Sequence, residues 1–408
     1  MPVFVIATLD TKGAEAAFVR DRLQALGIET RLVDAGSLGG PTVPADISRE
    51  QVFAAAGQSL AEIVAHNDRG AAVTAAALGA ERLIRDAHSG GEVQGVLSIG
   101  GSAGTTIGTQ AMRALPIGVP KVMVSTLASG QVRQWVADKD ILMLNSIVDI
   151  AGINRISRQV LGQAAAAMAG LVQHGTVPST SDRSDDKPLI AASMFGVTTP
   201  CVQQAREILE AAGYEVLVFH ATGNGGQAME SLIRDGLIAG VLDITTTELA
   251  DELVGGILSA GPDRLTAAGQ LGVPQVVSVG ALDMVNFGPR STVPERFAQR
   301  TYYQHNPSVT LMRTTPDECE KLGEEIGRKV SAAKGPATIL LPARGVSAID
   351  REGQPFQDTA ARARLFAGIR RTADNVEVVE LDAHINDAEF ARAAADRLLQ
   401  LIQSPRER

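Results

Sequence analysis

The chain of 408 residues is poor in several residue types, and each shortage excludes a class of protein. It has only two cysteines, Cys201 and Cys319, which are too few for a disulfide framework or a cysteine-based zinc site. Aromatic residues make up 3% of the chain, so its core must be built from Val, Ile, Leu and Ala. The formal net charge of −9 offers no general attraction for nucleic acid or for an anionic membrane surface.

Long apolar runs are also missing. A membrane-spanning helix needs roughly 18 apolar residues, and the longest candidate here, residues 160–172, contains Gly162, Gln163 and Gly170. The first six residues lack the basic segment of a signal peptide and predict a first β-strand. We therefore expect a cytoplasmic protein with neither a membrane nor a nucleic acid as its partner.

What is present is the pattern of an α/β protein. Hydrophobic residues make up 45% and charged residues 20%, as in globular proteins, and the length predicts two or three domains. Short Val/Ile-rich runs alternate with helical stretches, which is typical of parallel sheets covered by helices. Strands are predicted at 3–8, 29–33, 95–99, 121–125 and 141–144, and later at 308–312, 337–341 and 376–381. Helices are predicted at 14–26, 48–66, 71–88 and, last, 387–402.

Two halves of the chain resemble each other. Residues 178–188 are rich in Ser, Asp and Pro, the composition of a linker. After this stretch, four short sequences return in the order in which they occur before it. The pairs are 5–8 and 189–192, 26–29 and 212–215, 95–98 and 240–243, and 118–122 and 272–276. We interpret them as an internal duplication that produces two doubly wound parallel-sheet lobes, 1–177 and 189–408, joined by the linker 178–188.

A glycine-rich loop follows the third predicted strand and opens a helix. Its residues include Gly100, Gly101, Ser102, Gly104 and Thr105. In an open parallel sheet, ligands bind beyond the carboxyl ends of the strands, and the free N–H groups of a helix N-terminus attract phosphate or carboxylate. The loop has neither the Gly-Lys-[Ser/Thr] of a Walker A loop nor Gly-x-Gly-x-x-Gly spacing. It therefore predicts an anion site of another kind or, alternatively, a tight turn that holds no ligand.

Loops after the first and fourth strands can complete such a site. Asp10, Thr11 and Lys12 follow the first strand, where Lys12 supplies a cation and Asp10 can orient it or hold a metal ion. In the alternative reading, Asp10 or Thr11 caps the next helix and Lys12 is solvated. After the fourth strand, hydroxyl and backbone groups that otherwise serve only as turn residues come from Thr126, Ser129 and Gly130.

The second lobe carries different chemistry at the same place. Residues 243–252 replace the glycines with threonines and carboxylates, and 280–288 follow the next strand. Such groups suit the hydroxyls of a polar substrate or a divalent cation. Alternatively, the first of these loops is a threonine-capped helix start with acidic residues in its first turn. The substrate-binding candidates are Asp243, Thr246, Glu248, Asp283 and Asn286.

Three further residues are candidates for catalysis. His305 lies in a segment predicted to be irregular, Arg344 follows a strand end, and His384 follows the last strand. Arginine suits a carboxylate or phosphate, and histidine transfers protons near neutral pH. A single histidine in a loop is more often structural. The sequence contains no Gly-x-Ser-x-Gly elbow and no His-Glu-x-x-His motif.

Five of these stretches together resemble the family of Tm-1-like ATP-binding proteins. They are ATLDTKGxE at 7–15, GGSxGT at 100–105, DxTTTE at 243–248, GAxDMVNFG at 280–288 and HIND at 384–387. The matches extend over nearly the whole chain. The resemblance implies a two-lobed nucleotide-binding protein that is often dimeric, with ATP as its cofactor. It implies no particular reaction.

The leading hypothesis is therefore a protein that binds ATP, with Mg²⁺ as a second cofactor if it uses the nucleotide to act on a small polar acid. The expected partners are a nucleotide, a small polar ligand and a second copy of the chain, in a homodimer or higher homo-oligomer. One alternative is a nucleotide-responsive interaction module without turnover. Another is an ATP-independent lyase or hydrolase of carbohydrate acids that works through His305, Arg344 and His384.

Overall fold

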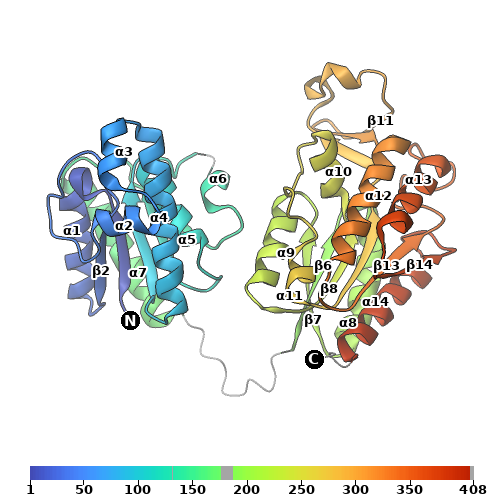
Figure 1. Ribbon diagram of the computed structural model, residues 1–408, viewed down its shortest axis with the longest axis horizontal. Coiled ribbons are helices and arrows are strands. Elements are labelled where there is room, and N and C mark those ends of the chain that lie inside the picture. The colour runs from blue at the N-terminus through green and yellow to red at the C-terminus, as the bar shows by residue number, and fades with distance from the viewer. Residues whose placement is uncertain (131, 176–186, 405–408) are drawn as a thin grey trace. The chain divides into compact units, whose positions relative to one another are not determined.

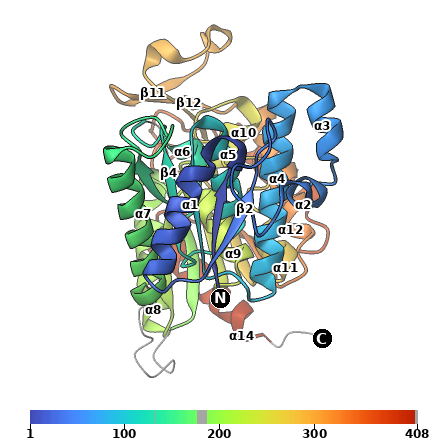
Figure 2. The same cartoon turned by 90° about the vertical axis from the view of Figure 1, so that its left-hand side faces the viewer.

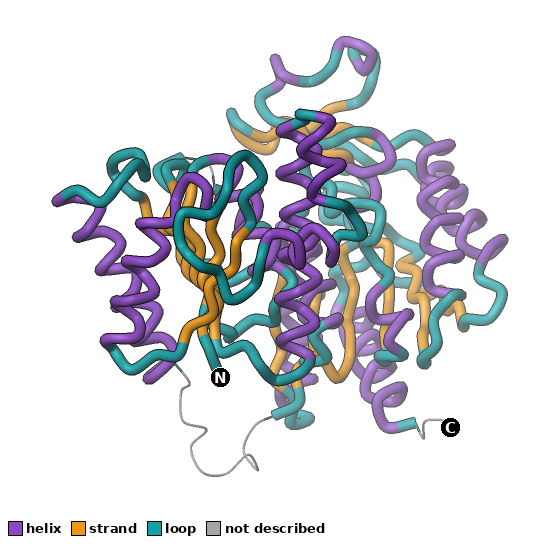
Figure 3. Tube along the Cα trace, turned by 60° about the vertical axis from the view of Figure 1, so that its left-hand side comes forward, coloured by secondary structure: helices purple, strands orange, loops and turns teal. Residues whose placement is uncertain are grey.

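A computed structural model describes residues 1–130, 132–175 and 187–404. The chain forms two compact units, Met1–Ser181 and Asp182–Arg408 (Figure 1). In each unit a parallel sheet lies between layers of helices (Figure 3), so the predicted α/β class is confirmed. Of the predicted linker 178–188, only Lys187 and Pro188 belong to the described residues.

The N-terminal unit is built on a five-stranded parallel sheet with the order β2-β1-β3-β4-β5. Its strands are β1 (Val3–Ala7), β2 (Thr30–Asp34), β3 (Gly95–Gly100), β4 (Lys121–Ser125) and β5 (Leu142–Asn145). Its helices are α1 (Leu9–Ala25), α2 (Arg49–Ala55), α3 (Leu60–His66), α4 (Arg69–Ser89), α5 (Ser102–Arg113), α6 (Arg133–Val136) and α7 (Arg155–His174).

The core of this unit has two layers, one on each face of the sheet, and the side chains of β1 contribute to both in turn. Val3 and Val5 pack with α1 and α7, whereas Phe4 and Ile6 pack with α2, α4 and α5. Successive residues of a strand point to opposite faces, so an uninterrupted apolar run supplies both layers. Figure 2 shows α1 and α7 on one side of the sheet and α2 and α4 on the other.

The prediction of a single helix at 48–66 is wrong in one respect, because the structure has two helices there, α2 and α3. The interruption includes Gly57, whose φ of +77° lies in the left-handed region that favours glycine. Ser48 caps α2 in a capping box with Gln51, and this feature fixes the helix start at the predicted place.

The C-terminal unit has a six-stranded parallel sheet with the order β14-β13-β9-β8-β6-β7. Its strands are β6 (Leu189–Met194), β7 (Glu215–His220), β8 (Ile238–Thr245), β9 (Gln275–Gly280), β13 (Ala337–Pro342) and β14 (Glu377–Leu381). Helices α8 (Thr199–Ala211) and α14 (Ala388–Gln403) pack on one face. The remaining helices are α9 (Asn224–Arg234), α10 (Thr247–Val254), α11 (Ala267–Leu271), α12 (Pro316–Ser331) and α13 (Thr359–Thr372), with 3-10 turns at Gly196–Thr198, Arg290–Thr292 and Glu295–Phe297.

A separate antiparallel sheet in this unit corrects the prediction for residues 308–312. The strand exists as β12 (Val309–Arg313), but it lies between β10 (Met284–Phe287) and β11 (Tyr302–Asn306) rather than in the parallel sheet. Met312 is paired with Val285 on one side and with Tyr302 on the other. The segment predicted to be irregular around His305 is therefore the strand β11, which lies at the top of the unit in Figure 1.

The two parallel sheets share a strand order. Taken in chain order, β6, β7, β8, β9 and β13 occupy the same relative places as β1 to β5. This order is common among doubly wound sheets, so the internal duplication stays a prediction.

Both cysteines are buried in the C-terminal unit, Cys201 on α8 and Cys319 on α12. Burial raises the pKa of Cys201 to about 12 and also raises that of Cys319. Among the helices of the described residues, none is both long enough and apolar enough to cross a membrane.

Candidate functional site

A cavity of about 250 Å³ lies at the carboxyl ends of the strands in the N-terminal unit. Its walls come from the loops after β1, β2, β3 and β5 and from the first turns of α4 and α5. Strands β1 and β3 are neighbours in the sheet, and the chain leaves them toward opposite edges. The cavity thus occupies the topological switch point, the position at which doubly wound sheets bind ligands.

The start of α5 forms one wall of this cavity. Gly101 is its N-cap residue, and no side chain of the described residues caps the helix there. Backbone N–H groups in the first turn of a helix lack partners within the helix, and they carry the positive end of its dipole. This wall therefore presents hydrogen-bond donors and a partial positive charge to the cavity.

The glycines of this loop serve different purposes. A Cβ on Gly100 would lie 2.6 Å from the Cα of Gly104, so the tight turn requires glycine at Gly100. Gly101 has a φ of −81°, which any residue adopts, and a Cβ there would lie 3.7 Å from Thr126 Oγ1, an ordinary contact. The turn thus does not require glycine at Gly101, although a side chain there would stand beside the cavity.

Lys12 and Asp10 enter the cavity from the first helix, which begins earlier than predicted. The N-cap residue of α1 is Thr8, so the alternative in which Asp10 or Thr11 caps the helix is wrong. Lys12 interrupts the helix with a φ of −126°, and its ammonium donates to the carbonyl of Ile150. That bond ties the loop after β5 to α1.

Asp10 is engaged by the protein itself. Its Oδ2 accepts the N–H groups of Leu38 at 2.8 Å and Gly39 at 3.3 Å, and lies 4.0 Å from Arg49 Nη1. These contacts shape the loop after β2. Among the described residues there is no cluster of three or more His, Cys, Asp or Glu that could hold a metal ion, so a metal at Asp10 stays a prediction.

Arg69 is a cavity residue that sequence reasoning missed. It is exposed, begins α4 directly after the N-cap Asp68, and forms no hydrogen bond or ion pair within the described part of the chain. An arginine after a capping aspartate has no distinctive local pattern, because its place at the cavity depends on how α4 packs. The cavity therefore has two cations, Lys12 and Arg69.

The structure brings together most, but not all, of the residues predicted for this site. The cavity is lined by Asp10, Thr11, Lys12, Gly100, Gly101, Ser102 and Gly104. Thr105 is buried beneath it, where its hydroxyl bonds to Ser125 Oγ at 2.6 Å. Thr126, Ser129 and Gly130 lie outside the lining, the last two exposed to solvent.

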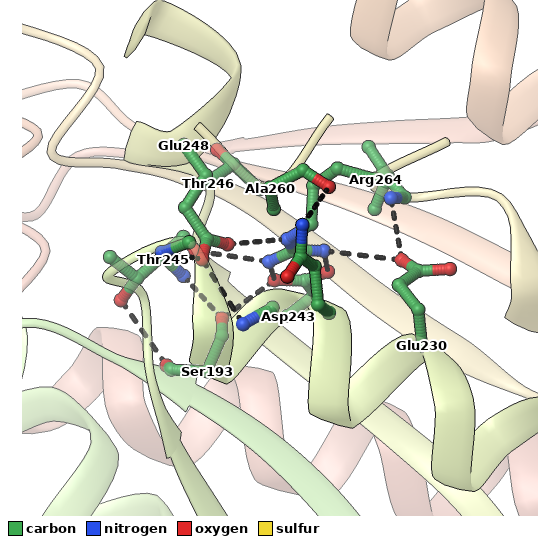
Figure 4. A network of polar contacts seen from close by, with 12 residues as sticks. Ser193, Glu230, Asp243, Thr245, Thr246, Glu248, Ala260 and Arg264 are labelled. Atoms are coloured by element: carbon green, nitrogen blue, oxygen red, sulfur yellow. Dashed lines mark hydrogen bonds and ion pairs between the residues drawn. The ribbon is translucent and has the colours of Figure 1, made fainter. Parts of the chain in front are cut away.

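The switch point of the C-terminal unit is filled by an arginine from its own chain (Figure 4). Arg264 is 1% exposed and donates to Asp243 at 2.5 and 2.7 Å and to Glu248 at 2.6 Å. Its Nη1 also lies 3.5 Å from Glu230. Burial raises the pKa of Glu248, whereas the charge of Arg264 opposes the rise. Burial alone would lower the pKa of Arg264, but the three carboxylates raise it well above its usual value.

All five substrate-binding candidates of this unit are at most 1% exposed. Thr246 Oγ1 donates to the carbonyl of Ser278 at 3.0 Å. Asn286 Nδ2 donates to Asp251 at 2.7 Å, and Ser347 Oγ donates to Asp283 at 2.7 Å. Burial raises the pKa of Asp283 to about 7, although nearby Arg313 opposes the rise. Asp243, Thr246, Glu248, Asp283 and Asn286 thus lie inside the unit, bonded to its own groups.

The three catalytic candidates are divided between two places. Arg344 and His384 line a second cavity, of about 840 Å³, whereas His305 is exposed on β11 and lies outside that lining. His384 is 2% exposed, and its two ring nitrogens are both bonded. Nδ1 accepts the N–H of Asn386 at 3.1 Å, which leaves Nε2 as the donor to the carbonyl of Ser347 at 2.8 Å.

This arrangement predicts a pH dependence of stability. Burial lowers the pKa of His384, so below about pH 6.5 the unfolded chain binds a proton more readily than the folded protein does. The stabilising contribution is complete above that pH and is lost as the pH falls. Glutamine can form both bonds without titrating, so we expect His384→Gln to unfold with a weaker dependence on pH between about 7 and 5. Urea denaturation of both proteins measures this, and parallel pH profiles would contradict it.

Each of the two units matches a family model of its own. The model described as the uncharacterised protein family (UPF0261) N-terminal domain matches residues 1–176, and the model of the C-terminal domain matches residues 187–402. The chain belongs to the UPF0261 family.

Individual relatives of this UPF0261 chain agree with the assignment. A UPF0261 protein of Clostridium tetani is 48% identical over 403 residues, which are 98% of this chain and 99% of the relative. The ToMV resistance protein Tm-1(GCR237) of Solanum lycopersicum is 45% identical over 345 residues, and the ToMV susceptible protein tm-1(GCR26) is 39% identical over 419. The matches cover 83% and 98% of this chain but only 45% and 55% of the two tomato proteins. The chain is thus Tm-1-like, as the motifs predicted.

Proposed function

We propose that the N-terminal unit of this UPF0261 chain binds ATP through its phosphate groups. The observation that carries the proposal is the uncapped start of α5, which lines the same cavity as Lys12 and Arg69. Backbone donors at a helix N-terminus and flanking cations are the two features that recur in phosphate sites. The position at the switch point of the sheet supports the same conclusion.

The size of the cavity limits how a nucleotide fits. Small-molecule sites typically enclose about 300–1,000 Å³, and this cavity has about 250 Å³. It suits the phosphate chain, while the ribose and base extend toward solvent. Asp149 is an exposed residue of the lining whose Oδ1 accepts the N–H of Ile150, and its other oxygen is available to a Mg²⁺ ion carried by the phosphates. Asp10 is less available because it already accepts two backbone N–H groups.

We propose that the N-terminal unit binds ATP, and we propose no reaction for it. ATP-driven chemistry on a small polar acid and a nucleotide-responsive module both require this binding step, and assembly into a homo-oligomer stays a prediction. The names of the tomato relatives refer to ToMV, and no viral role is proposed here.

Calorimetric titration of the whole chain with ATP, with and without Mg²⁺, tests the proposal. We expect saturable binding that Lys12→Ala weakens roughly tenfold, since one charge-assisted bond is lost while backbone donors remain. Arg22→Ala removes a cation from the same helix at an exposed position outside the cavity and should leave binding unchanged. Because Lys12 also holds the carbonyl of Ile150, melting curves without ligand must accompany the titration. Absence of binding at millimolar ATP would overturn the proposal.

A further inference from the structure

The second cavity lies in the C-terminal unit, at the carboxyl ends of β13 and β14. Its volume of about 840 Å³ is within the range of about 300–1,000 Å³ that small-molecule sites occupy. Three arginines line it: Arg344 and Arg351 from the loop after β13, and Arg362 from the first turns of α13. His384 contributes from the loop after β14.

Arg362 is the least exposed of the three arginines. Its side chain is only 10% exposed, and a single guanidinium nitrogen, Nη1, is bonded, to Asp350 Oδ2 at 2.9 Å. Asp350 is fully buried and also accepts the N–H groups of Val346 and Asp358, so it holds Arg362 in place. The other N–H groups of Arg362 have no acceptor within the described residues. None of these nitrogens is fully buried, so they are accessible from the cavity, where an acceptor from a ligand can bond to them.

Arg351 provides a second guanidinium that an incoming anion can engage. It bonds to Asp387 at 3.0 Å, and the two side chains are 53% and 37% exposed. Exposed ion pairs of this kind contribute little to stability, so a ligand carboxylate can compete for the arginine. The planar fork of guanidinium matches the two oxygens of a carboxylate.

The carboxylates of the lining limit the charge of the ligand. Glu352 and Asp387 both face this cavity, and Glu352 is exposed and forms no bond within the described residues. Two negative groups disfavour a polyphosphate, but Glu352 can accept hydrogen bonds from hydroxyl groups. Thr359, the first residue of α13, adds a hydroxyl and the positive end of a helix dipole.

We propose that this cavity binds a small hydroxylated organic acid, whose carboxylate lies between Arg351 and Arg362 and whose hydroxyl groups donate to Glu352. This cavity shares no lining residue with the proposed nucleotide site.

Titration calorimetry of the whole chain with tartrate as the probe tests this proposal. We expect saturable binding that is weakened at least about tenfold in both Arg362→Gln and Arg351→Gln. Arg364→Gln is the matched control, since Arg364 lies on the same helix and pairs with Asp317 outside the cavity. Lys12→Ala, which tests the nucleotide site, should also bind tartrate normally. Arg351 is exposed, so its variant keeps the test valid even if Arg362→Gln lowers stability.

Malonate, which has no hydroxyl group, tests the part played by Glu352. We expect it to bind several-fold more weakly than tartrate, and Glu352→Gln to reduce the difference between the two. Equal binding of both acids would contradict the contact with Glu352. Failure of the wild-type chain to bind tartrate at millimolar concentration, or binding that survives both arginine substitutions, would overturn the site itself.

Discussion

Replacing Arg264 by methionine is expected to lower the free energy of unfolding of the C-terminal unit by about 3–5 kcal/mol. Methionine fills much of the same space but leaves Asp243 and Glu248 without their shared cation, inside the unit where no solvent reaches them. Removing one member of a buried ion network leaves the other charges uncompensated. This lowers stability more than replacing the whole network by apolar residues would. Backbone N–H groups from Gly223 and Gly226 still stabilise Glu248, which limits the loss.

The two units can be followed separately during unfolding, because Trp135 is the only tryptophan and lies in the N-terminal unit. In urea, we expect Arg264→Met to leave the fluorescence transition of Trp135 in place and to shift the part of the circular dichroism transition that comes from the C-terminal unit. Arg206→Met removes an exposed cation paired with Glu210, and should change stability by only about 0.3–0.5 kcal/mol. An Arg264→Met protein as stable as this control would show that the buried network contributes little.

Substituting Gly101 by aspartate is expected to abolish ATP binding without unfolding the protein. The new carboxylate would stand at the start of α5, where the phosphate groups are proposed to lie, and would repel them. Each charge-assisted hydrogen bond contributes about 1.5–3 kcal/mol, so losing one of them and adding repulsion should weaken binding at least about a hundredfold. The backbone conformation at Gly101 accepts any residue, and its Cβ position is free of close contacts, so the fold should tolerate the change.

The control for this variant is Gly162→Asp, which adds the same charge at an open position of α7, away from the cavity. Calorimetry with ATP and thermal melting without ligand are needed for both proteins. If Gly101→Asp melts like the wild type and still binds ATP, the start of α5 is not the phosphate site. If it melts at a much lower temperature than Gly162→Asp, the loop has a structural role that the backbone geometry does not indicate.

Local patterns were sufficient to predict the five parallel strands of the N-terminal unit and the last two of the C-terminal unit. Lys121–Ser125 was predicted with the observed bounds, and the strand that begins at Gly95 was predicted within one residue, because a buried parallel strand is a short, mostly apolar run. The glycine loop was placed correctly at a strand end for a similar reason. Strand order followed from none of these patterns, since it depends on contacts between residues far apart in the chain.

The errors come from long-range contacts as well. Val309–Arg313 has the composition of a core strand, and only its pairing with Met284–Phe287 assigns it to the antiparallel sheet. Arg264 was missed because one arginine after Gly-Pro-Asp resembles a surface turn. Its burial is explained by Asp243 and Glu248, which are 21 and 16 residues away in the chain. Sequence reasoning found the carboxylates and left them to a ligand or to the start of a helix, and neither reading included this arginine.

Both cysteines are buried, so thiol reagents should react only slowly with the native protein. The thiolate is the reactive form, and burial raises the pKa of each thiol. A cysteine introduced on the surface of the N-terminal unit would therefore be labelled alone, without prior removal of the natural ones. A fluorophore attached at such a position would report ligand binding in the N-terminal unit. The rate at which Cys201 and Cys319 are slowly modified would measure how often the C-terminal unit opens transiently.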